Sequence, residues 1–184
     1  MNVLDQTLEL CVKEGIEYIS FWALAKKNIE ERSADELSHI YNLLKKEIVR
    51  LTPKMVAQSV RFETIGNLHL LPDDVNEALD AAREATKDCC KHTCILAIGY
   101  GGQDEIVRAT KRAIIEGVDP ETLDEKSFLR YMDSGRFPAP DLIVRTGGDS
   151  RHSGYFLYQA EYSEYYFTQT LWPDFSEAEF YRAL

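Results

Sequence analysis

The sequence predicts an α/β fold in which a mostly parallel central sheet is flanked by helices. Short runs of β-branched and aromatic residues alternate along the chain with longer amphipathic segments, an order typical of this fold class. The apolar runs contain few polar positions, as in parallel strands that are buried on both faces. With 184 residues, of which 45% are hydrophobic, the chain can bury one substantial core. We therefore expect residues 1–184 to form a single domain.

Four apolar runs are expected to form the strands. Because helical segments separate them, the strands should be joined by right-handed crossovers and should run parallel to one another. The four runs are "IEYISFWAL" (16–24), "VRFETIG" (60–66), "CILAIGYG" (94–101) and "DLIVRT" (141–146).

The helices between these strands have recognisable ends. Ser33 and Glu36 form a capping-box pattern at the start of a long amphipathic segment, and Pro53 lies where we expect that helix to have ended. Pro72 suits the first turn of a second helix. A third helix is expected to start near Gln103, after a glycine-rich turn.

The charge of the chain limits its partners. Its 21 Lys and Arg residues stand against 31 Asp and Glu, which gives a formal net charge of −10. This balance works against general binding to nucleic acid or to anionic lipid, so any phosphate site must be local. The first residues lack the pattern of a signal peptide, and no apolar run approaches the length of a membrane span. We therefore expect a cytoplasmic protein.

The stretch "CCKHTC" (89–94) has two interpretations. Its cysteines and histidine are crowded enough to suggest zinc, but the spacing matches no usual structural-zinc pattern and no second pair of ligands appears elsewhere. The alternative is a helix end that leads into a buried strand, with the cysteines packed as small apolar side chains in a reducing compartment.

The stretch "RTGGDSRHSGY" (145–155) suits an anion. Two arginines can present guanidinium groups, Gly147 and Gly148 can let backbone amides approach closely, and Ser153 adds a hydroxyl; together these groups favour phosphate or diphosphate. In open α/β sheets such ligands bind beyond the carboxyl ends of the strands. The alternative is a solvated turn whose arginines pair with Asp149 and neighbouring acids.

Acidic and aromatic residues are mixed in "AEYSEYYFTQTLWPDF" (160–175). A carboxylate beside a diphosphate needs a divalent cation between them, and hard oxygen ligands suit magnesium. We expect most of the aromatic side chains to lie in the core. The stretch nevertheless has more aromatic residues than one solvated edge needs, which favours a subunit interface over part of it.

The segment 140–175, "PDLIVRTGGDSRHSGYFLYQAEYSEYYFTQTLWPDF", closely resembles the C-terminal signature of the cis-prenyltransferases, the family of undecaprenyl diphosphate synthase. Upstream, "GIEYISFWALAKKN", "TIGNLHLLPDDV" and "YGGQDEI" resemble the other blocks of the family in the same order. The resemblance covers nearly the whole chain and identifies it as one cis-prenyltransferase-like domain.

The resemblance implies a homodimer that uses magnesium to condense isopentenyl diphosphate with an allylic diphosphate, with the new double bond in cis. It also implies peripheral contact with a membrane through the lipid product. Residue by residue, it assigns proton removal to Asn28, substrate binding to Arg32, the diphosphate of isopentenyl diphosphate to Arg145, Arg151, Ser153 and Gly154, and magnesium to Glu164.

The chain departs from the family pattern at two places. The family's "DGNxRW" motif, whose aspartate binds the magnesium of the allylic diphosphate, has no counterpart here, and "FSxENW" has become "LAKKNI" (24–29). Relative to the family we expect a domain that is shortened at both ends. Three interpretations remain open: part of a working enzyme, a catalytically inactive partner subunit of an active homologue, and a divergent enzyme.

Overall fold

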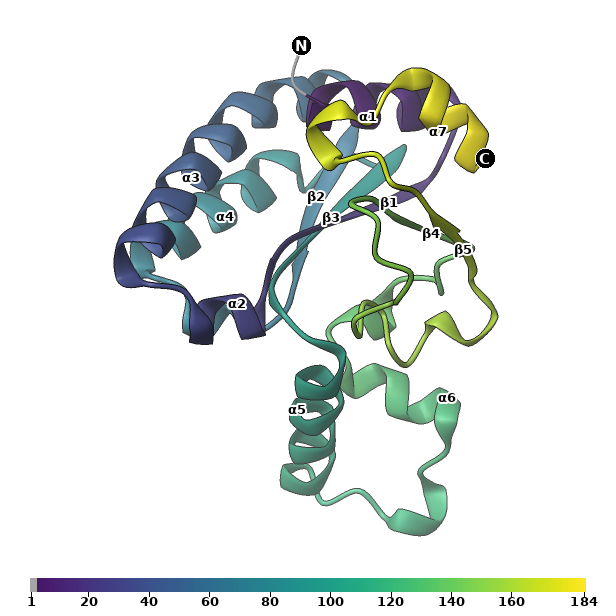
Figure 1. The fold of residues 1–184 in the computed structure, drawn as a ribbon. Coiled ribbons are helices and arrows are strands. Elements are labelled where there is room, and N and C mark those ends of the chain that lie inside the picture. The colour runs from purple at the N-terminus through teal and green to yellow at the C-terminus, as the bar shows by residue number, and fades with distance from the viewer. Residues whose placement is uncertain (1–2) are drawn as a thin grey trace. The chain divides into compact units, whose positions relative to one another are not determined.

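The structure is a computed structural model that describes residues 3–184 (Figure 1). By its internal contacts the chain divides into two compact units. We call Gly15–Gly101 the three-strand unit. The two-strand unit joins the N-terminal segment up to Glu14 to Gly102–Leu184. Each unit combines parallel strands with helices, which confirms the predicted α/β class.

The three-strand unit is built on a parallel sheet in the order β1-β3-β2. Its central strand, β3, is buried from Cys94 to its end, as expected for a strand with neighbours on both sides. The predicted strands and their parallel pairing are therefore confirmed here. The elements of this unit are β1 (Tyr18–Ala25), α2 (Lys26–Glu31), α3 (Ala34–Ala57), β2 (Val60–Ile65), α4 (Asp73–Thr86) and β3 (His92–Tyr100).

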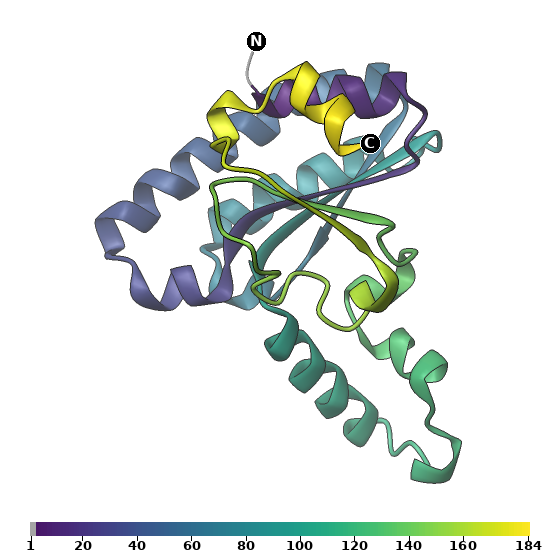
Figure 2. The same cartoon turned by 45° about the vertical axis from the view of Figure 1, so that its right-hand side comes forward.

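Helices α3 and α4 lie side by side and pack on β2, as both views show (Figures 1 and 2). The capping box at the start of α3 is confirmed, since the Glu36 amide donates to Ser33 Oγ and the Ser33 amide donates to Glu36 Oε2. The prediction that α3 ends before Pro53 is wrong, because the helix continues to Ala57. A proline inside a helix leaves the carbonyl four residues earlier without its donor. That residue, Val49, is exposed, so water can satisfy its carbonyl.

The outer edge of β2 is closed by the end of α4. The Phe62 amide donates to Thr86 Oγ1 at 3.0 Å, and the Thr86 hydroxyl donates to the Ala82 carbonyl at 2.8 Å. Thr86 is 0% exposed, so no water can replace it. One hydroxyl therefore satisfies an edge amide that the parallel ladder leaves unpaired.

The carboxyl ends of β2 and β3 approach each other closely through two glycines. Gly66 and Gly99 both have positive φ, and a Cβ on Gly66 would lie 2.0 Å from the Ile98 carbonyl oxygen. The Asn67 amide donates to the Gly99 carbonyl at 3.1 Å. Only glycine fits this geometry, which fixes the loops at the edge of the sheet where substrates of α/β proteins bind.

The two-strand unit contains a second parallel pair of strands, β4 and β5. The strand predicted at 141–146 is confirmed as β4, whereas its partner β5 falls in the aromatic stretch for which no strand was expected. Helix α1 packs beside α7, and Lys13 donates to the Tyr181 hydroxyl. The elements are α1 (Val3–Lys13), α5 (Gly102–Ile115), α6 (Glu125–Phe128), β4 (Leu142–Arg145), β5 (Glu164–Phe167) and α7 (Glu177–Ala183).

A buried carboxylate anchors the start of α5. Glu105 is 0% exposed and accepts hydrogen bonds from the Ser134 amide at 2.8 Å and the Ser134 hydroxyl at 2.6 Å. One turn along the helix, Arg108 forms ion pairs with Asp104 and Asp133. These contacts tie α5 to the turn that precedes β4. Among the described residues, no helix has both the length and the apolar character that crossing a bilayer requires.

Replacing Thr86 with valine should destabilise the protein by about 1–3 kcal/mol, because the Phe62 amide would remain buried without an acceptor. Valine has nearly the same shape, so no cavity contributes. Denaturant unfolding of the parent and the variant measures the difference. Thr86→Ser is the matched control, since it keeps the hydroxyl and loses only one buried methyl group, and it should lose less stability than Thr86→Val. Equal stability of Thr86→Val and the parent would show that the hydroxyl does not support β2.

Candidate functional site

Two arginines of the two-strand unit share one carboxylate oxygen. We call residues 145–154, which follow β4, the arginine loop. Arg145 Nη2 and Arg151 Nη2 each donate to Asp149 Oδ2 at 2.7 Å. Arg145 Nη1 also donates to Ser153 Oγ at 2.6 Å and to the Arg151 carbonyl at 2.8 Å. The predicted residues Arg145, Arg151 and Ser153 are thus brought together around Asp149.

The charge of this group is only partly balanced. Two guanidinium cations surround one carboxylate, and the side chains of Arg145, Asp149 and Arg151 are 24%, 41% and 66% exposed. At such exposure the ion pairs add little to stability. The remaining N–H groups of Arg151 donate to no other described residue, so donors and one net positive charge stay available to an incoming anion. The pairing with Asp149, one of the two sequence interpretations, is therefore compatible with an anion site.

The two glycines of the loop are used differently from the prediction. Gly147 and Gly148 were expected to offer their amides to the anion. Instead the Gly147 amide donates to the Thr170 carbonyl at 2.8 Å and the Gly148 amide donates to the Thr168 carbonyl at 2.9 Å. Both glycines have φ near +90°, which other residues rarely adopt. Their function here is to let the loop turn back against the segment that follows β5.

Gly154 joins the arginine loop to the start of α5. Its amide donates to His152 Nδ1 at 2.9 Å, and its carbonyl accepts from the Gly102 amide at 3.1 Å. A Cβ on Gly102 would lie 2.4 Å from that carbonyl oxygen, so only glycine permits this contact. The neighbouring Ser153 has φ 51°, a conformation that keeps its hydroxyl against Arg145. Direct substrate binding by Gly154 stays a prediction.

Glu164 lies away from the arginine loop in the same chain. It begins β5 and pairs in register with Leu142, whereas Arg145 at the other end of β4 pairs with Phe167. Three residues of strand correspond to about 10 Å. Glu164 is exposed, and nowhere in residues 3–184 do three metal-binding side chains gather. The described carboxylates of one chain therefore do not assemble a magnesium site by themselves.

Asn28 and Arg32 belong to the three-strand unit. Asn28 Oδ1 accepts from the Ala25 amide at 3.3 Å, and Ala25 pairs with Tyr100 at the carboxyl ends of β1 and β3. The Asn28 Nδ2 group donates to no other described residue. Arg32 is the C-cap residue that follows α2, and it is exposed. Both residues thus follow the carboxyl end of a parallel strand, the position predicted for ligand-binding residues in this fold class.

Three residues near the arginine loop were missed by the sequence interpretation. Thr168 and Thr170 hold its glycine amides through their carbonyls, and Glu179 of α7 accepts hydrogen bonds from the hydroxyls of Thr168 and Tyr166. These contacts join residues that are 11 to 23 positions apart, so no local pattern indicates them.

Comparisons with known proteins agree with this fold. Residues 1–184 match the family described as putative undecaprenyl diphosphate synthase. A tritrans,polycis-undecaprenyl-diphosphate synthase (geranylgeranyl-diphosphate specific) of Thermoplasma volcanium is 34% identical over 189 residues, which cover 100% of this chain and 73% of that protein. An isoprenyl transferase of Aquifex aeolicus is 34% identical over 183 residues, which cover 100% of this chain and 78% of that protein.

Two solved structures resemble the protein in both fold and sequence. A probable undecaprenyl diphosphate synthase from Campylobacter jejuni has a TM-score of 0.88 at 34% identity, over 98% of this chain and 85% of that one. Lavandulyl diphosphate synthase from Lavandula x intermedia, in complex with dimethylallyl diphosphate, has a TM-score of 0.91 at 29% identity, over 98% of this chain and 80% of that one. With a family match over its whole length and these relatives, the chain belongs to the undecaprenyl diphosphate synthase family of isoprenyl transferases.

Proposed function

We propose that this protein condenses isopentenyl diphosphate with an allylic diphosphate to give a cis-polyprenyl diphosphate. The observation that carries the proposal is the arginine loop, in which Arg145 and Arg151 converge on one carboxylate oxygen beside Ser153. In this reaction a new carbon–carbon bond forms at the allylic carbon, the bond to its diphosphate breaks, and a proton leaves the isopentenyl unit. We propose that the two units act as one cis-prenyltransferase domain.

The arginine loop is proposed to hold the diphosphate of isopentenyl diphosphate. A diphosphate has more acceptor oxygens and more negative charge than one carboxylate, so it can replace Asp149 as the bridge between Arg145 and Arg151. Planar guanidinium groups bind such oxygens in pairs, and the hydroxyl of Ser153 adds a further donor. Fixing this end of the substrate orients its double bond, which lowers the barrier through positioning.

Asn28 and Arg32 are proposed to act on the substrates from the three-strand unit. With its oxygen held by the Ala25 amide, Asn28 keeps Nδ2 to orient the isopentenyl unit as its proton leaves. Arg32, whose exposed side chain forms no ion pair with another described residue, can bind diphosphate oxygens. Gly154, which has no side chain, would let the diphosphate approach the backbone closely beside Ser153.

Magnesium is the proposed cofactor, with Glu164 as its protein ligand. Because the described carboxylates of one chain do not gather around an ion, most of its ligands would be oxygens of the bound diphosphates, as is common for this metal. When bound, magnesium would neutralise part of the negative charge of the diphosphates. The protein's own share of that neutralisation comes from the guanidinium groups of the arginine loop.

Exposed aromatic side chains support a homodimer. Tyr162 is 90% exposed, and Tyr165 and Phe167 stack on each other with ring centroids 5.6 Å apart while both remain exposed. Most aromatic residues of 160–175 were expected in the core, and that expectation is wrong, although Phe175 is buried. A surface of this kind fits a subunit interface. We propose that β5 and the residues beside it form part of the seam.

The proposed location is the cytoplasm, with peripheral membrane contact through the apolar product. The four cysteines, none of which forms a disulfide, suit a reducing compartment. The alternative role, a catalytically inactive partner subunit, finds no support in the comparisons, since the similar proteins named above are described as synthases and transferases.

Prenyl transfer is tested by incubating the protein with isopentenyl diphosphate, magnesium and an allylic diphosphate. Geranylgeranyl diphosphate is the first choice because the Thermoplasma volcanium relative is described as specific for it. Mass spectrometry should detect polyprenyl diphosphates longer than the primer. Binding of isopentenyl diphosphate without any transfer to geranylgeranyl, farnesyl or dimethylallyl diphosphate would contradict the proposed activity and favour the partner-subunit role.

Replacing Arg145 or Arg151 with alanine should weaken binding of isopentenyl diphosphate by about 1.5–3 kcal/mol, because each change removes a charge-assisted contact. This corresponds to an increase in Kd of about tenfold to a hundredfold, measured by calorimetry in the presence of magnesium. Arg50→Ala, which removes an exposed ion pair with Glu47 on α3, is the matched control. If both loop variants bound like Arg50→Ala, the arginine loop would not be the diphosphate site.

Light scattering should give a mass twice the 21.1 kDa of one chain. Tyr165→Glu should shift the protein toward monomer at micromolar concentration, because a carboxylate in a desolvated aromatic interface has no partner. Leu43→Glu places the same charge at an exposed site on α3 and should leave the mass unchanged. A parent that is strictly monomeric, or a Tyr165→Glu variant that dimerises like the parent, would refute the proposed seam.

A further inference from the structure

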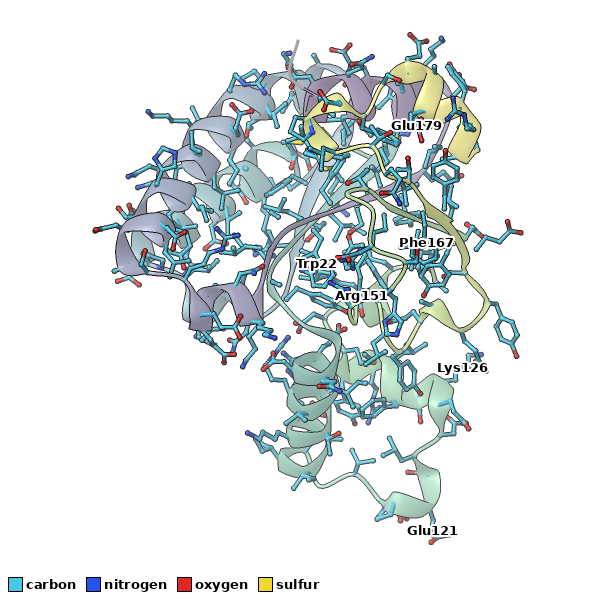
Figure 3. All side chains as sticks on the ribbon, in the orientation of Figure 1. Trp22, Glu121, Lys126, Arg151, Phe167 and Glu179 are labelled. Atoms are coloured by element: carbon cyan, nitrogen blue, oxygen red, sulfur yellow. The ribbon has the colours of Figure 1, made fainter. Side chains whose placement is uncertain are left out.

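A carboxylate outside the arginine loop is connected to it by a short series of hydrogen bonds. Glu179 of α7, labelled in Figure 3, is 7% exposed. Its Oε1 accepts from the Tyr166 hydroxyl and from the Thr168 hydroxyl, both at 2.7 Å. Its Oε2 accepts from Arg182 Nη1 at 3.0 Å. We expect no substrate group to contact Glu179. Its side-chain partners other than Arg182 are Tyr166, which lies on β5, and Thr168, which directly follows β5.

The contact with Glu179 fixes the direction of the Thr168 hydroxyl. The pKa of Glu179 lies below its ordinary value because the hydroxyls of Thr168 and Tyr166 donate to it, so at neutral pH it is ionised and can only accept. The single hydrogen of the Thr168 hydroxyl is therefore donated to Glu179. The lone pairs of Thr168 Oγ1 then face the Thr170 amide, which donates to them at 3.2 Å. This closes a turn over residues 168–170.

That turn holds the backbone of the arginine loop. The Thr168 amide donates to the Arg145 carbonyl at 3.0 Å, the Gly148 amide donates to the Thr168 carbonyl at 2.9 Å, and the Gly147 amide donates to the Thr170 carbonyl at 2.8 Å. Three backbone hydrogen bonds thus fix residues 145–148. This segment includes Arg145 and is followed directly by Asp149. The position of the 168–170 turn therefore sets the position of the Arg145 backbone, from which the guanidinium group extends.

We propose that Glu179 is a positioning residue for diphosphate binding, which acts through the 168–170 turn to hold Arg145 in place for its ligand. This inference rests on the proposed function of the arginine loop. Without the carboxylate, the Thr168 hydroxyl can rotate, the Thr170 amide loses a fixed acceptor, and the loop gains freedom. A diphosphate must then order the loop as it binds, which lowers affinity without removing any ligand contact.

A merely structural role is the competing explanation, since Glu179 also belongs to the first turn of α7, where its amide donates to Ser176 Oγ at 3.2 Å. Its ion pair with Arg182 could equally serve to stabilise the helix. The two roles differ in what they affect. A structural role changes the unfolding temperature alone, whereas positioning changes diphosphate affinity in protein that is fully folded.

The test compares four variants by calorimetry with inorganic diphosphate and with isopentenyl diphosphate, well below each unfolding temperature. Glu179→Leu, which removes both acceptor oxygens, and Thr168→Val should each raise Kd by about three- to tenfold. Thr168→Ser restores the hydroxyl and should bind like the parent. Arg182→Ala removes the partner of Glu179 Oε2 without touching the turn and should also bind like the parent. In the transfer assay, KM for isopentenyl diphosphate should rise with little change in kcat.

Hydrogen exchange of the Gly147 and Gly148 amides gives a second readout, which remains available if Glu179→Leu folds poorly. Their protection should fall in Thr168→Val and stay at the parent level in Arg182→Ala. The proposal is overturned if Thr168→Val binds inorganic diphosphate as the parent does, or if Arg182→Ala loses as much affinity as Glu179→Leu. A parent that binds inorganic diphosphate but transfers no prenyl group would refute the proposed function and leave this comparison intact.

Discussion

The site depends on keeping two arginines together when no ligand is bound. The two guanidinium groups are both positively charged and repel each other. Asp149 offsets that repulsion because one of its carboxylate oxygens accepts a hydrogen bond from each of them. The two guanidinium groups are thereby held together, as the proposed diphosphate site requires, and the remaining N–H groups of Arg151, whose side chain is 66% exposed, stay available. An acidic protein with a net charge of −10 needs such a local arrangement, because its overall field repels the substrate rather than attracting it.

The rest of the two-strand unit supports this arrangement through its backbone. Strand β4 delivers Arg145 at its carboxyl end, and β5 runs parallel to it and leads into the turn at 168–170. Positive φ at Gly147 and Gly148 turns the loop so that its amides meet carbonyls of that turn. The backbone of the loop is thus fixed by internal hydrogen bonds, so its side chains are the groups available to bind a ligand. This division of roles leaves the side chains able to exchange Asp149 for the proposed diphosphate while the backbone stays in place.

Local patterns in the sequence predicted local structure well. The capping box at Ser33 and the apolar runs of the first four strands are confirmed, since their signals lie within a few residues. The predicted end of α3 was wrong because tertiary packing of Met55, which is 2% exposed, outweighs the free-energy cost of Pro53 within the helix. Strand β5 was missed because its aromatic residues suggested core, whereas three of its four residues are exposed.

The candidate site was predicted in its residues and only partly in its geometry. The arginines and Ser153 stand close in the sequence, and their convergence is found, but the partners of the glycine amides lie about 20 positions away, beyond any local signal. Register with Leu142 likewise places Glu164 at the far end of β4 from Arg145, which spacing along the chain could not indicate. The partners of the glycine amides and the position of Glu164 follow from strand pairing, which the composition of the sequence does not reveal.

A crystal structure of the protein with inorganic diphosphate and magnesium would show directly whether the arginine loop binds diphosphate. We expect a diphosphate that accepts hydrogen bonds from Arg145, Arg151 and Ser153, with the Asp149 carboxylate moved from its bridging position. The hydrogen bonds of Gly147 and Gly148 to the 168–170 turn should be retained. A diphosphate bound elsewhere, with Asp149 still bridging the two arginines, would contradict this expectation.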